Sequence, residues 1–509
     1  MAVKVFLSSV CNHEVIGNLV KSDNWEPCYW IIPFKIQEKV KEVFPDVTMH
    51  DTYEAELCIP SSELRSLELK PLDQPLLKEL VYHESIVLKM MDRMDPYNVF
   101  GYKERLEFYY KHLRYWSAVL EKFKPEIVLF NIVPHQISNY VIYILSCQKG
   151  LRTAFSCITG FVYLNAHLHK IEDELPAVAL YKKTLAKDGI CTVLLSAKMQ
   201  KYIDKARQSC YEDALPARIL MVKHTVKKND IINRSLVRSI YECLCDFRTI
   251  LASILKPPRE HFVKRKGKKL TDPFWSRFEF SLYKYKFKRK KLSFARYYER
   301  IAEVPDLKCK YVYVALAKQP ELSTCPQGDF YVDQRLMIEV LSKSVPEGWN
   351  IYVKENILQF NEKFAGECSR SYEYYDTIAS LANVKLVSLR THSSFDLIDN
   401  AESVASVTGT TGFEAVLRGI PAITFGRAWY NGCEGVYHVS SYEECRKVIK
   451  EIEKDCVVNY EKVRMFLSAL EESCFNYCIL DKELQYADIS YEENVKNLTK
   501  SIQEACKGV

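Results

Sequence analysis

The sequence lacks the features that mark integral membrane and secreted proteins. No stretch approaches the roughly 18 consecutive apolar residues that span a bilayer, and the richest runs, such as residues 141–147, are short. The first ten residues carry one lysine and too short an apolar stretch for a secretory signal. We therefore expect a cytoplasmic protein in which residues 3–7 form a buried first strand.

Paired cysteines and metal-ligand motifs are also missing. The 18 cysteines are scattered over 509 residues without a Cys-x-x-Cys pair, and the closest two are Cys243 and Cys245. This spacing indicates reduced thiols in a reducing compartment. No group of His, Cys, Asp and Glu has the spacing typical of a metal site, so we expect a metal-independent protein. Internal repeats and low-complexity segments are absent from the sequence.

What is present indicates a folded chain of two domains. Apolar residues make up 48% and charged residues 27%, close to the averages of globular proteins. A single core stops growing at roughly 250 to 300 residues, and this chain is longer. We predict a first domain over residues 1–256, a basic aromatic linker over 257–305, a second domain over 306–475 and a helical segment over 476–509.

Alternating strands and helices predict an α/β fold in both halves. In the first half, the short apolar runs 126–130 and 152–156 are expected to be strands, and residues 140–148 between them have a helical pattern. Strand, helix and strand in this order form a βαβ unit. Long helical stretches are expected over 64–122 and 197–255. In the second half the expected strands are 311–316, 349–353, 384–389, 404–407 and 422–425, and the expected helices are 333–343, 372–382 and 412–417. We predict two Rossmann-like doubly wound domains, with ligands beyond the carboxyl ends of the strands.

The sharpest signal is a run of small residues between a strand and a helix. Thr408, Gly409, Thr410, Thr411 and Gly412 follow the strand directly, and Glu414 falls in the first helical turn. Small residues let a backbone approach a ligand, and free amides with hydroxyls favour a phosphate. Glu414 is suited to accept hydrogen bonds from a ribose or sugar hydroxyl. The alternative is structural: the threonines cap the helix and Glu414 complements its dipole.

Two further polar segments follow strands of the second half. One holds Gln319, Glu321 and Asp333, and the other is Lys354, Glu355 and Asn356. Carboxyl ends of parallel strands share one edge of a sheet, so a cation, carboxylates and amides are expected to converge where a nucleotide sugar would bind. The alternative for Lys354 and Glu355 is a solvated charge pair.

These segments together resemble the bacterial capsule and surface polysaccharide synthesis proteins, which include retaining transferases of 3-deoxy-manno-octulosonic acid. The matching motifs are Gln319-Pro-Glu321 with Ser323-Thr-Cys-Pro326, Val353-Lys-Glu-Asn356, the block from Thr408 to Tyr430, and Pro134-His135. The resemblance implies a GT-B fold in which the second domain holds a nucleotide-sugar donor and the first holds a glycan or lipid-linked acceptor. It also implies a CMP-linked acidic sugar as donor substrate, with no cofactor. Asn356 and Asn139 stand where the family often has histidine and an acidic residue, respectively. These two differences leave open the alternative that the chain is an inactive relative of the family.

Candidate catalytic residues follow from these motifs. His135 comes after a predicted strand of the first domain and suits acid-base chemistry or stabilisation of a leaving phosphate, whereas a lone histidine is often structural. Glu321 and Asp333 are the candidate nucleophile or base. Arg427, with Trp429 and Tyr430, is expected to contact donor or acceptor, or alternatively to pack between the domains.

Positive charge is concentrated between residues 259 and 291, although the net charge is only +6. A solvated linker and contact with an anionic membrane surface both fit this run, and we expect no nucleic-acid partner. The sequence as a whole predicts a cytoplasmic glycosyltransferase that acts on a surface or capsular glycan. The basic run adds the expectation of a peripheral position at the inner face of the membrane. Two alternatives are a UDP-sugar epimerase of the same architecture and a non-catalytic glycan-binding or assembly protein derived from a transferase.

Overall fold

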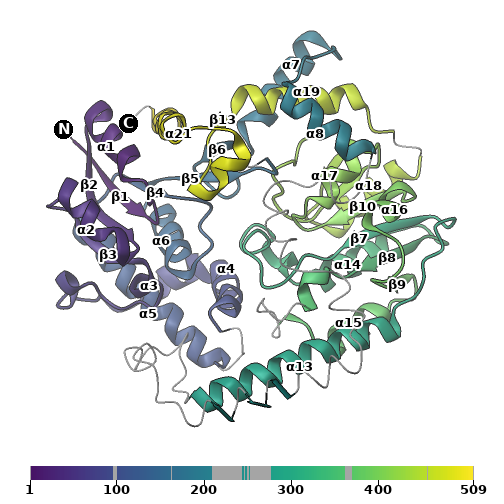
Figure 1. Cartoon of the computed structure of the whole chain (residues 1–509), viewed down its shortest axis with the longest axis horizontal. Coiled ribbons are helices and arrows are strands. Elements are labelled where there is room, and N and C mark those ends of the chain that lie inside the picture. Colours follow the sequence, from purple (N-terminus) through teal and green to yellow (C-terminus); the bar gives the residue numbers. More distant parts are fainter. Residues whose placement is uncertain are drawn as a thin grey trace.

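The chain forms two α/β domains that lie side by side (Figure 1). The computed structural model describes residues 2–95, 100–161, 163–208, 277–360, 369–454 and 457–507, together with the short pieces 244–245, 247–248 and 251–252. Each domain is built on one predominantly parallel sheet. The predicted α/β class with two doubly wound domains of GT-B type is confirmed.

The first sheet has the strand order β13-β6-β5-β4-β1-β2-β3. Strands β1 to β5 are parallel, whereas β6 and β13 join the edge in antiparallel pairs. The bounds are β1 (Val3–Ser8), β2 (Trp25–Ile32), β3 (Thr48–Asp51), β4 (Ile127–Phe130), β5 (Arg152–Ile158), β6 (Leu164–Leu168) and β13 (Phe475–Asn476). The strands expected at 3–7, 126–130 and 152–156 are confirmed as β1, β4 and β5.

Helices cover both faces of this sheet, because its central strands are apolar on both sides. Phe6, Tyr29 and Phe130 face one core, and Leu7, Trp30 and Leu129 face the other. The helices and turn of this part are α1 (His13–Asp23), α2 (Phe34–Val43), α3 (Thr52–Glu56), α4 (Gln74–Met90), the 3₁₀ turn η2 (Met91–Arg93), α5 (Tyr102–Phe123), α6 (Ile137–Gln148), α7 (Pro176–Asp188) and α8 (Ala197–Gln208).

The second sheet is fully parallel, with the order β12-β11-β10-β7-β8-β9. Its first strand β7 lies at the centre, so the order reverses between β7 and β10, which is where ligands bind in doubly wound folds. The strands are β7 (Tyr311–Ala315), β8 (Asn350–Lys354), β9 (Val384–Leu386), β10 (Ser403–Ser406), β11 (Ala422–Thr424) and β12 (Val436–His438). All five strands predicted for this half are present, and β12 was not predicted.

The helices of the second half agree with the predicted ones within a few residues. The predicted helices 333–343, 372–382 and 412–417 are α14 (Gln334–Ser344), α15 (Tyr372–Ala379) and α17 (Thr411–Leu417). The others are α13 (Arg277–Ile301), α16 (Ser394–Asp399), α18 (Tyr442–Ile452), α19 (Tyr460–Ser473), α20 (Leu484–Ala487) and α21 (Tyr491–Cys506). Of the predicted linker 257–305, residues 257–276 lie outside the described residues, and most of the remainder is α13.

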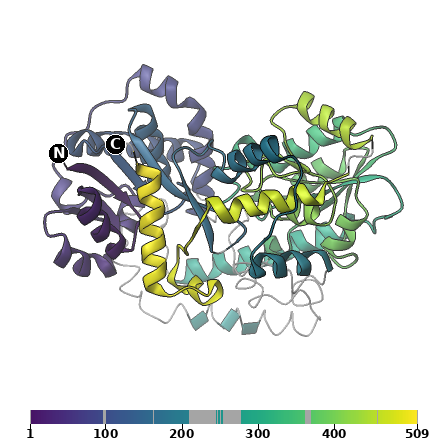
Figure 2. The same ribbon diagram turned by 90° about the horizontal axis from the view of Figure 1, so that it is seen from above.

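The chain crosses between the domains in both directions. Helices α7 and α8 follow the first sheet in sequence but contact α19 and α17 of the second half. The end of the chain returns, because β13 pairs with β6 and α21 packs on α1. Figure 2 shows α21 against the first domain and α19 running toward the second. Most of the helical stretch predicted over 197–255 lies outside the described residues, apart from α8.

Two findings bear on the expectations about membranes and cysteines. Among the described residues, no helix has the length and hydropathy needed to cross a membrane. The cysteines of this part of the chain are free thiols, and several, such as Cys157 and Cys433, are buried.

Candidate functional site

The loop after β10 is held by contacts that only small residues allow. A Cβ at Gly412 would lie 2.5 Å from the Tyr430 hydroxyl oxygen, and that hydroxyl donates to the Gly409 carbonyl over 2.5 Å. Helix α17 begins at Thr411, and the Thr410 side chain makes no capping hydrogen bond. Thr408 Oγ1 is buried without a partner among the described residues. The capping alternative therefore does not account for Thr410 or Thr408.

A second loop, between β7 and α14, lies directly on this first one. A Cβ at Gly426 would lie 2.8 Å from Thr408 Cγ2, 2.8 Å from the Gln327 carbonyl oxygen and 3.0 Å from Gly328 Cα. The Arg427 amide donates to the Gln327 carbonyl over 2.8 Å. The two predicted ligand-binding segments thus meet at the carboxyl edge of β7, β10 and β11.

Asp329 joins this edge to the first domain. Tyr82 of α4 donates a hydrogen bond to Asp329 Oδ2, and Arg427 Nη1 lies 3.9 Å from the same oxygen. The other carboxylate oxygen, Oδ1, is buried without a partner in the described part of the chain. Asp329 also has a φ of 53°, a left-handed conformation that costs a non-glycine residue energy. A strained, half-satisfied carboxylate between two domains is typical of a binding site.

Arg93 brings His135 and Glu321 together. This arginine of η2 donates to the His135 carbonyl oxygen, to the Glu321 carbonyl oxygen over 3.1 Å and to the Cys325 carbonyl oxygen over 3.3 Å. Three backbone segments from both domains therefore share one guanidinium group. His135 and Glu321 lie on opposite sides of the domain junction, and their carbonyl oxygens share the Arg93 side chain.

His135 is arranged to carry a free lone pair. Its Nδ1 donates to the Val133 carbonyl oxygen over 2.8 Å. Burial, and then the charge of Arg93, lowers the pKa of His135 to about 4. The ring is therefore neutral near pH 7, with its proton on Nδ1 and its lone pair on Nε2, and the lowered pKa makes Nε2 a weaker base than an ordinary histidine.

The two candidate carboxylates differ in their surroundings. Burial raises the pKa of Glu321, although Lys318 and Ser323 act against this. Burial acts to raise the pKa of Asp333 as well, but the hydrogen bonds and charge of Arg335 hold that pKa below its ordinary value. Asp333 caps α14 and binds Arg335 Nη2 over 2.6 Å. Of the two carboxyl groups, only Glu321 has its pKa raised, which makes it the better candidate for proton exchange.

Lys354 and Glu355 are buried rather than solvated. Glu355 Oε2 accepts from Arg370 Nε over 2.6 Å and from the Tyr375 hydroxyl over 2.8 Å. Oε1 accepts from Arg370 Nη2 over 3.2 Å and from the Asn356 amide over 2.8 Å. Lys354 Nζ donates to the His392 carbonyl over 2.5 Å. Both carboxylate oxygens of Glu355 are therefore occupied by protein donors, whereas Asn356 is half-buried at the end of the strand.

Glu414 and Trp429 line the side of the site that faces α8. Glu414 is buried, and its charge adds to the burial that raises the pKa of Tyr202. Trp429 contacts the rings of Phe161 and Phe413, with centroids 5.6 and 4.6 Å away. Its Nε1 is buried without a partner among described residues. Phe161 belongs to the first domain, so Trp429 packs between the domains.

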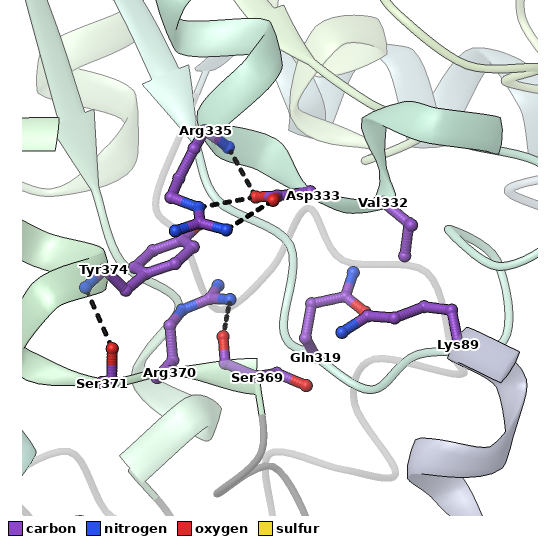
Figure 3. A pocket seen from close by; sticks show the side chains of 9 residues that line it. All are labelled: Lys89, Gln319, Val332, Asp333, Arg335, Ser369, Arg370, Ser371 and Tyr374. Carbon is purple, nitrogen blue, oxygen red and sulfur yellow. Dashed lines mark hydrogen bonds and ion pairs between the residues drawn. The ribbon is translucent and has the colours of Figure 1, made fainter. Parts of the chain in front are cut away.

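A cavity of about 150 Å³ opens on the other side of β7 (Figure 3). It contains the predicted residues Gln319 and Asp333. Its remaining lining residues are Lys89, Val332, Arg335, Ser369, Arg370, Ser371 and Tyr374. Within the described ranges, no group of three or more His, Cys, Asp or Glu side chains is placed to hold a metal ion.

Several residues of this site were not found from the sequence. Tyr82, Lys89 and Arg93 lie in a long helical stretch where charged and aromatic residues are expected on the surface. Asp329 and Arg370 belong to no motif. Only the turn-rich composition of 318–330 pointed to the Asp329 loop, and no local signal marks the others, because their partners are distant in sequence.

Two facing doubly wound domains with polar loops at their junction define the GT-B architecture, which is found in glycosyltransferases and in sugar-nucleotide epimerases. Residues 366–466 match the model of a family described as capsule polysaccharide biosynthesis protein. This segment contains Thr408 to Thr411, Glu414 and Arg427. The match confirms the family resemblance for this part of the chain.

Similar solved structures span more of the chain at low identity. The UDP-GlcNAc 2-epimerase of Methanocaldococcus jannaschii is 11% identical, covers 93% of this chain and 100% of its own, and has a TM-score of 0.25. A glycosyltransferase of Rickettsia africae is 9% identical over 100% of both chains, with a TM-score of 0.24. The β-Kdo 2,7 transferase KpsC of Thermosulfurimonas dismutans is 15% identical over 49% of this chain and 68% of its own, with a TM-score of 0.23.

TM-scores of this size carry no assignment, so the fold rests on the strand orders given above. No curated protein is detectably similar to the chain in sequence.

Because several histidines are buried, we expect the free energy of unfolding to fall in mild acid. Burial lowers the pKa of His50 and His135 to about 4 and that of His112 and His167 to about 3. Below the ordinary pKa of 6.5 the unfolded chain takes up protons that the native state excludes, so stability falls as pH drops from about 6.5 toward 4.

His50 and His112 are at most 1% exposed, and each is expected to lower the free energy of unfolding by about 2 kcal/mol between pH 7 and pH 5. Urea unfolding at the two pH values measures this. Burial raises the pKa of Glu56 and of Glu321, and protonation of these carboxyls in the native state offsets part of the loss. An unfolding midpoint that stays constant from pH 7 to pH 5 would contradict the prediction.

Proposed function

We propose that the chain is a metal-independent glycosyltransferase that moves a sugar from a nucleotide donor to the glycan or lipid-linked acceptor of a surface or capsular polysaccharide. The favoured donor is a CMP-linked acidic sugar, on the family resemblance alone. The observation that carries the proposal is the junction of the loops at Thr408, Gly426 and Asp329. Two buried polar atoms there, Thr408 Oγ1 and Asp329 Oδ1, have no described protein partner. Buried polar groups are nearly always hydrogen bonded, so a polar ligand accounts for both.

The residues take the following roles in this proposal. The hydroxyls of Thr408, Thr410 and Thr411 and the Gly409 backbone hold the donor phosphate with Arg427, and Glu414 holds the ribose or sugar. The donor site at this edge of the sheet also includes Gln319, Lys354 and Asn356. Glu355 orients the side chain of Arg370. Departure of the nucleotide leaves negative charge on its phosphate, which Arg427 and hydroxyl donors stabilise without a metal.

The acceptor side belongs to the first domain. His135 Nε2 removes the proton of the acceptor hydroxyl, with Glu321 across the junction as the second group that can exchange a proton. Asp333 is held by Arg335 and supports the loop. The family match and the fold favour a cytoplasmic transferase, and the basic helix α13 favours a peripheral position at the inner membrane face.

A thermal-shift screen against CMP, UDP, GDP and dTDP tests the donor site. A nucleotide at 100 times its dissociation constant should add roughly 2.7 kcal/mol of stability. Because the Thr410 side chain makes no cap hydrogen bond, we expect Thr410→Ala to keep the unliganded melting temperature and to lose most of the shift. Glu414→Ala should lose it as well. Thr377→Ala on the exposed side of α15 is the matched control and should respond like the parent protein.

The two alternatives give different results. Hydrolysis of one nucleotide sugar without acceptor, or transfer with it, supports the transferase. Interconversion of a UDP-sugar without any acceptor identifies an epimerase instead. A folded protein that responds to no nucleotide contradicts the donor site and leaves the glycan-binding or assembly role.

A further inference from the structure

The cavity beside β7 is built from both domains. Lys89 comes from α4 of the first domain, whereas Arg335, Arg370 and Tyr374 come from the second (Figure 3). In the sheet order, the loop after β8 lies on one side of β7 and the loop of Thr408 on the other. The cavity is therefore separate from the Thr408 loop, although Gln319 of the β7 loop reaches it.

Hydrogen-bond donors dominate the free groups of this cavity. Lys89 Nζ has one carboxylate partner, Asp92 at 2.7 Å, and its side chain stays 32% exposed. Arg335 binds Asp333 through Nε and Nη2, which leaves Nη1, and its side chain is 42% exposed. Ser371 Oγ accepts from the Tyr374 amide over 3.0 Å, and its hydroxyl donates to the Glu373 carboxylate, whose pKa it helps to lower. The one carboxylate that lines the cavity, Asp333, is already occupied by Arg335.

Tyr374 adds an independent indication of a ligand. It is only 7% exposed, and its hydroxyl has no partner among the described residues. The ring centroid lies 4.5 Å from Arg370 Cζ and 5.5 Å from Arg335 Cζ. Burial raises the pKa of Tyr374, against the charge of Arg370, so the hydroxyl stays protonated. It can therefore donate a hydrogen bond, and no described residue supplies an acceptor for it.

The backbone around the cavity also favours negative charge. Asp333 is the N-cap of α14 and Ser371 is the N-cap of α15, so the positive ends of two helix dipoles border the same space. Arg370 forms a buried ion pair with Glu355, and its guanidinium group packs on the ring of Tyr374. These groups match an acceptor with several oxygens and do not match a cation.

We propose that this cavity binds a phosphate-class oxyanion, held by Lys89 Nζ of the first domain and by Arg335 Nη1 and the Tyr374 hydroxyl of the second. Charge-assisted hydrogen bonds of this kind are the strong ones in proteins. The oxyanion is either free phosphate or the phosphoryl group of a larger molecule such as a phosphorylated acceptor. Since its ligands come from both domains, its binding favours the domain arrangement of this structure.

Calorimetric titration of the full chain with inorganic phosphate, in phosphate-free buffer, tests this site. Tyr374→Phe removes only the unpartnered hydroxyl, so we expect an unchanged melting temperature and about tenfold weaker phosphate binding, as for a hydrogen bond to a charged group. Tyr109→Phe is the matched control, because the Tyr109 hydroxyl is also buried and unpartnered but lies in the core of the first domain. It should bind phosphate like the parent protein. Lys89→Gln and Arg335→Gln should each weaken binding at least as much as Tyr374→Phe.

Thr410→Ala separates this site from the proposed donor site. Phosphate binding that survives in Thr410→Ala and weakens in Tyr374→Phe supports the oxyanion site, whatever the nucleotide screen gives. Binding that weakens in Thr410→Ala and survives in Tyr374→Phe overturns it, as does the absence of any phosphate binding by the parent protein. Glycerol phosphate in place of inorganic phosphate distinguishes the two sources, since tighter binding of the ester indicates a phosphorylated molecule and weaker binding indicates the free ion.

Discussion

Replacement of Glu355 by glutamine is expected to lower the free energy of unfolding by about 3–5 kcal/mol, the usual cost of removing one partner from a buried ion pair. The side chains of Arg370 and Glu355 are 2% and 0% exposed. Glutamine keeps one neutral acceptor oxygen, so the Arg370 guanidinium stays buried beside this oxygen and the Ser369 and Ala317 carbonyl oxygens, with its negative partner removed. The Tyr375 hydroxyl also loses a charged acceptor. Guanidinium unfolding of the variant and the parent protein measures the difference.

The same substitution at an exposed ion pair serves as the control. Glu174 lies 3.2 Å from Lys182, and both side chains are 61% exposed. Such pairs contribute about 0–1 kcal/mol, so Glu174→Gln should leave the unfolding midpoint almost unchanged. Equal stability losses in the two variants would show that burial of the Glu355 pair is not the cause.

Substitution of Gly426 by alanine is expected to lower the rate of sugar transfer about 100-fold, because a misplacement of roughly 1 Å at an active site has effects of this size. The added methyl group would lie within 3.0 Å of the Gln327 carbonyl oxygen, Thr408 Cγ2 and Gly328 Cα. Two of these atoms belong to the backbone and cannot rotate away. The added methyl group would therefore push the loop that contains Gln327, Gly328 and Asp329 away from Gly426 and from the loop of Thr408. The accompanying loss of stability should be about 1–3 kcal/mol, as for other overpacked sites.

Gly17→Ala provides the comparison for Gly426→Ala. Gly17 lies within α1, and nothing stands within 4 Å of its added Cβ. Alanine there should stabilise the helix by about 0.5–1 kcal/mol and leave nucleotide binding unchanged. Normal transfer by Gly426→Ala, measured together with the nucleotide thermal shift, would mean that the two loops do not need their present contact.

The fold was predictable where the local pattern was sufficient. Strands such as β4 and β7 are short apolar runs that end in polar residues, and the run of small residues at 408–412 marked the turn from β10 into α17. Strand β2 was missed, because Glu26 and Pro27 interrupt the apolar pattern between the buried Trp25 and the buried residues Tyr29 to Ile32. Strand β6 was missed because its five residues, Leu164–Leu168, include the polar Asn165 and His167 and form no continuous apolar run. It pairs antiparallel with its sequence neighbour β5 as well as with the distant β13.

The site was predictable only in part, for a related reason. Its motifs were found because strands of one sheet end at one edge, which placed Gln319, Thr408 and Arg427 together. Sequence spacing does not show which partner a charged residue will have. The sequence leaves Lys354-Glu355 open as a solvated pair or a ligand-binding group, and only the structure shows that Arg370 pairs with Glu355. Likewise, Arg93 and Tyr82 act across the junction of the domains, and no local pattern reports such a contact.

The return of the chain end to the first sheet limits how the protein can be divided. Neither half is a continuous piece of chain, since Tyr477, Val495 and Ile502 complete the same core as Val5 and Leu7. A fragment that stops before residue 475 would leave β6 as an unpaired sheet edge and would expose the apolar face that α21 covers. Exposed edges and faces of this kind promote self-association. Recombinant expression of the first domain alone therefore needs residues 475–507 joined back to it, by a fusion or by co-expression as a second polypeptide.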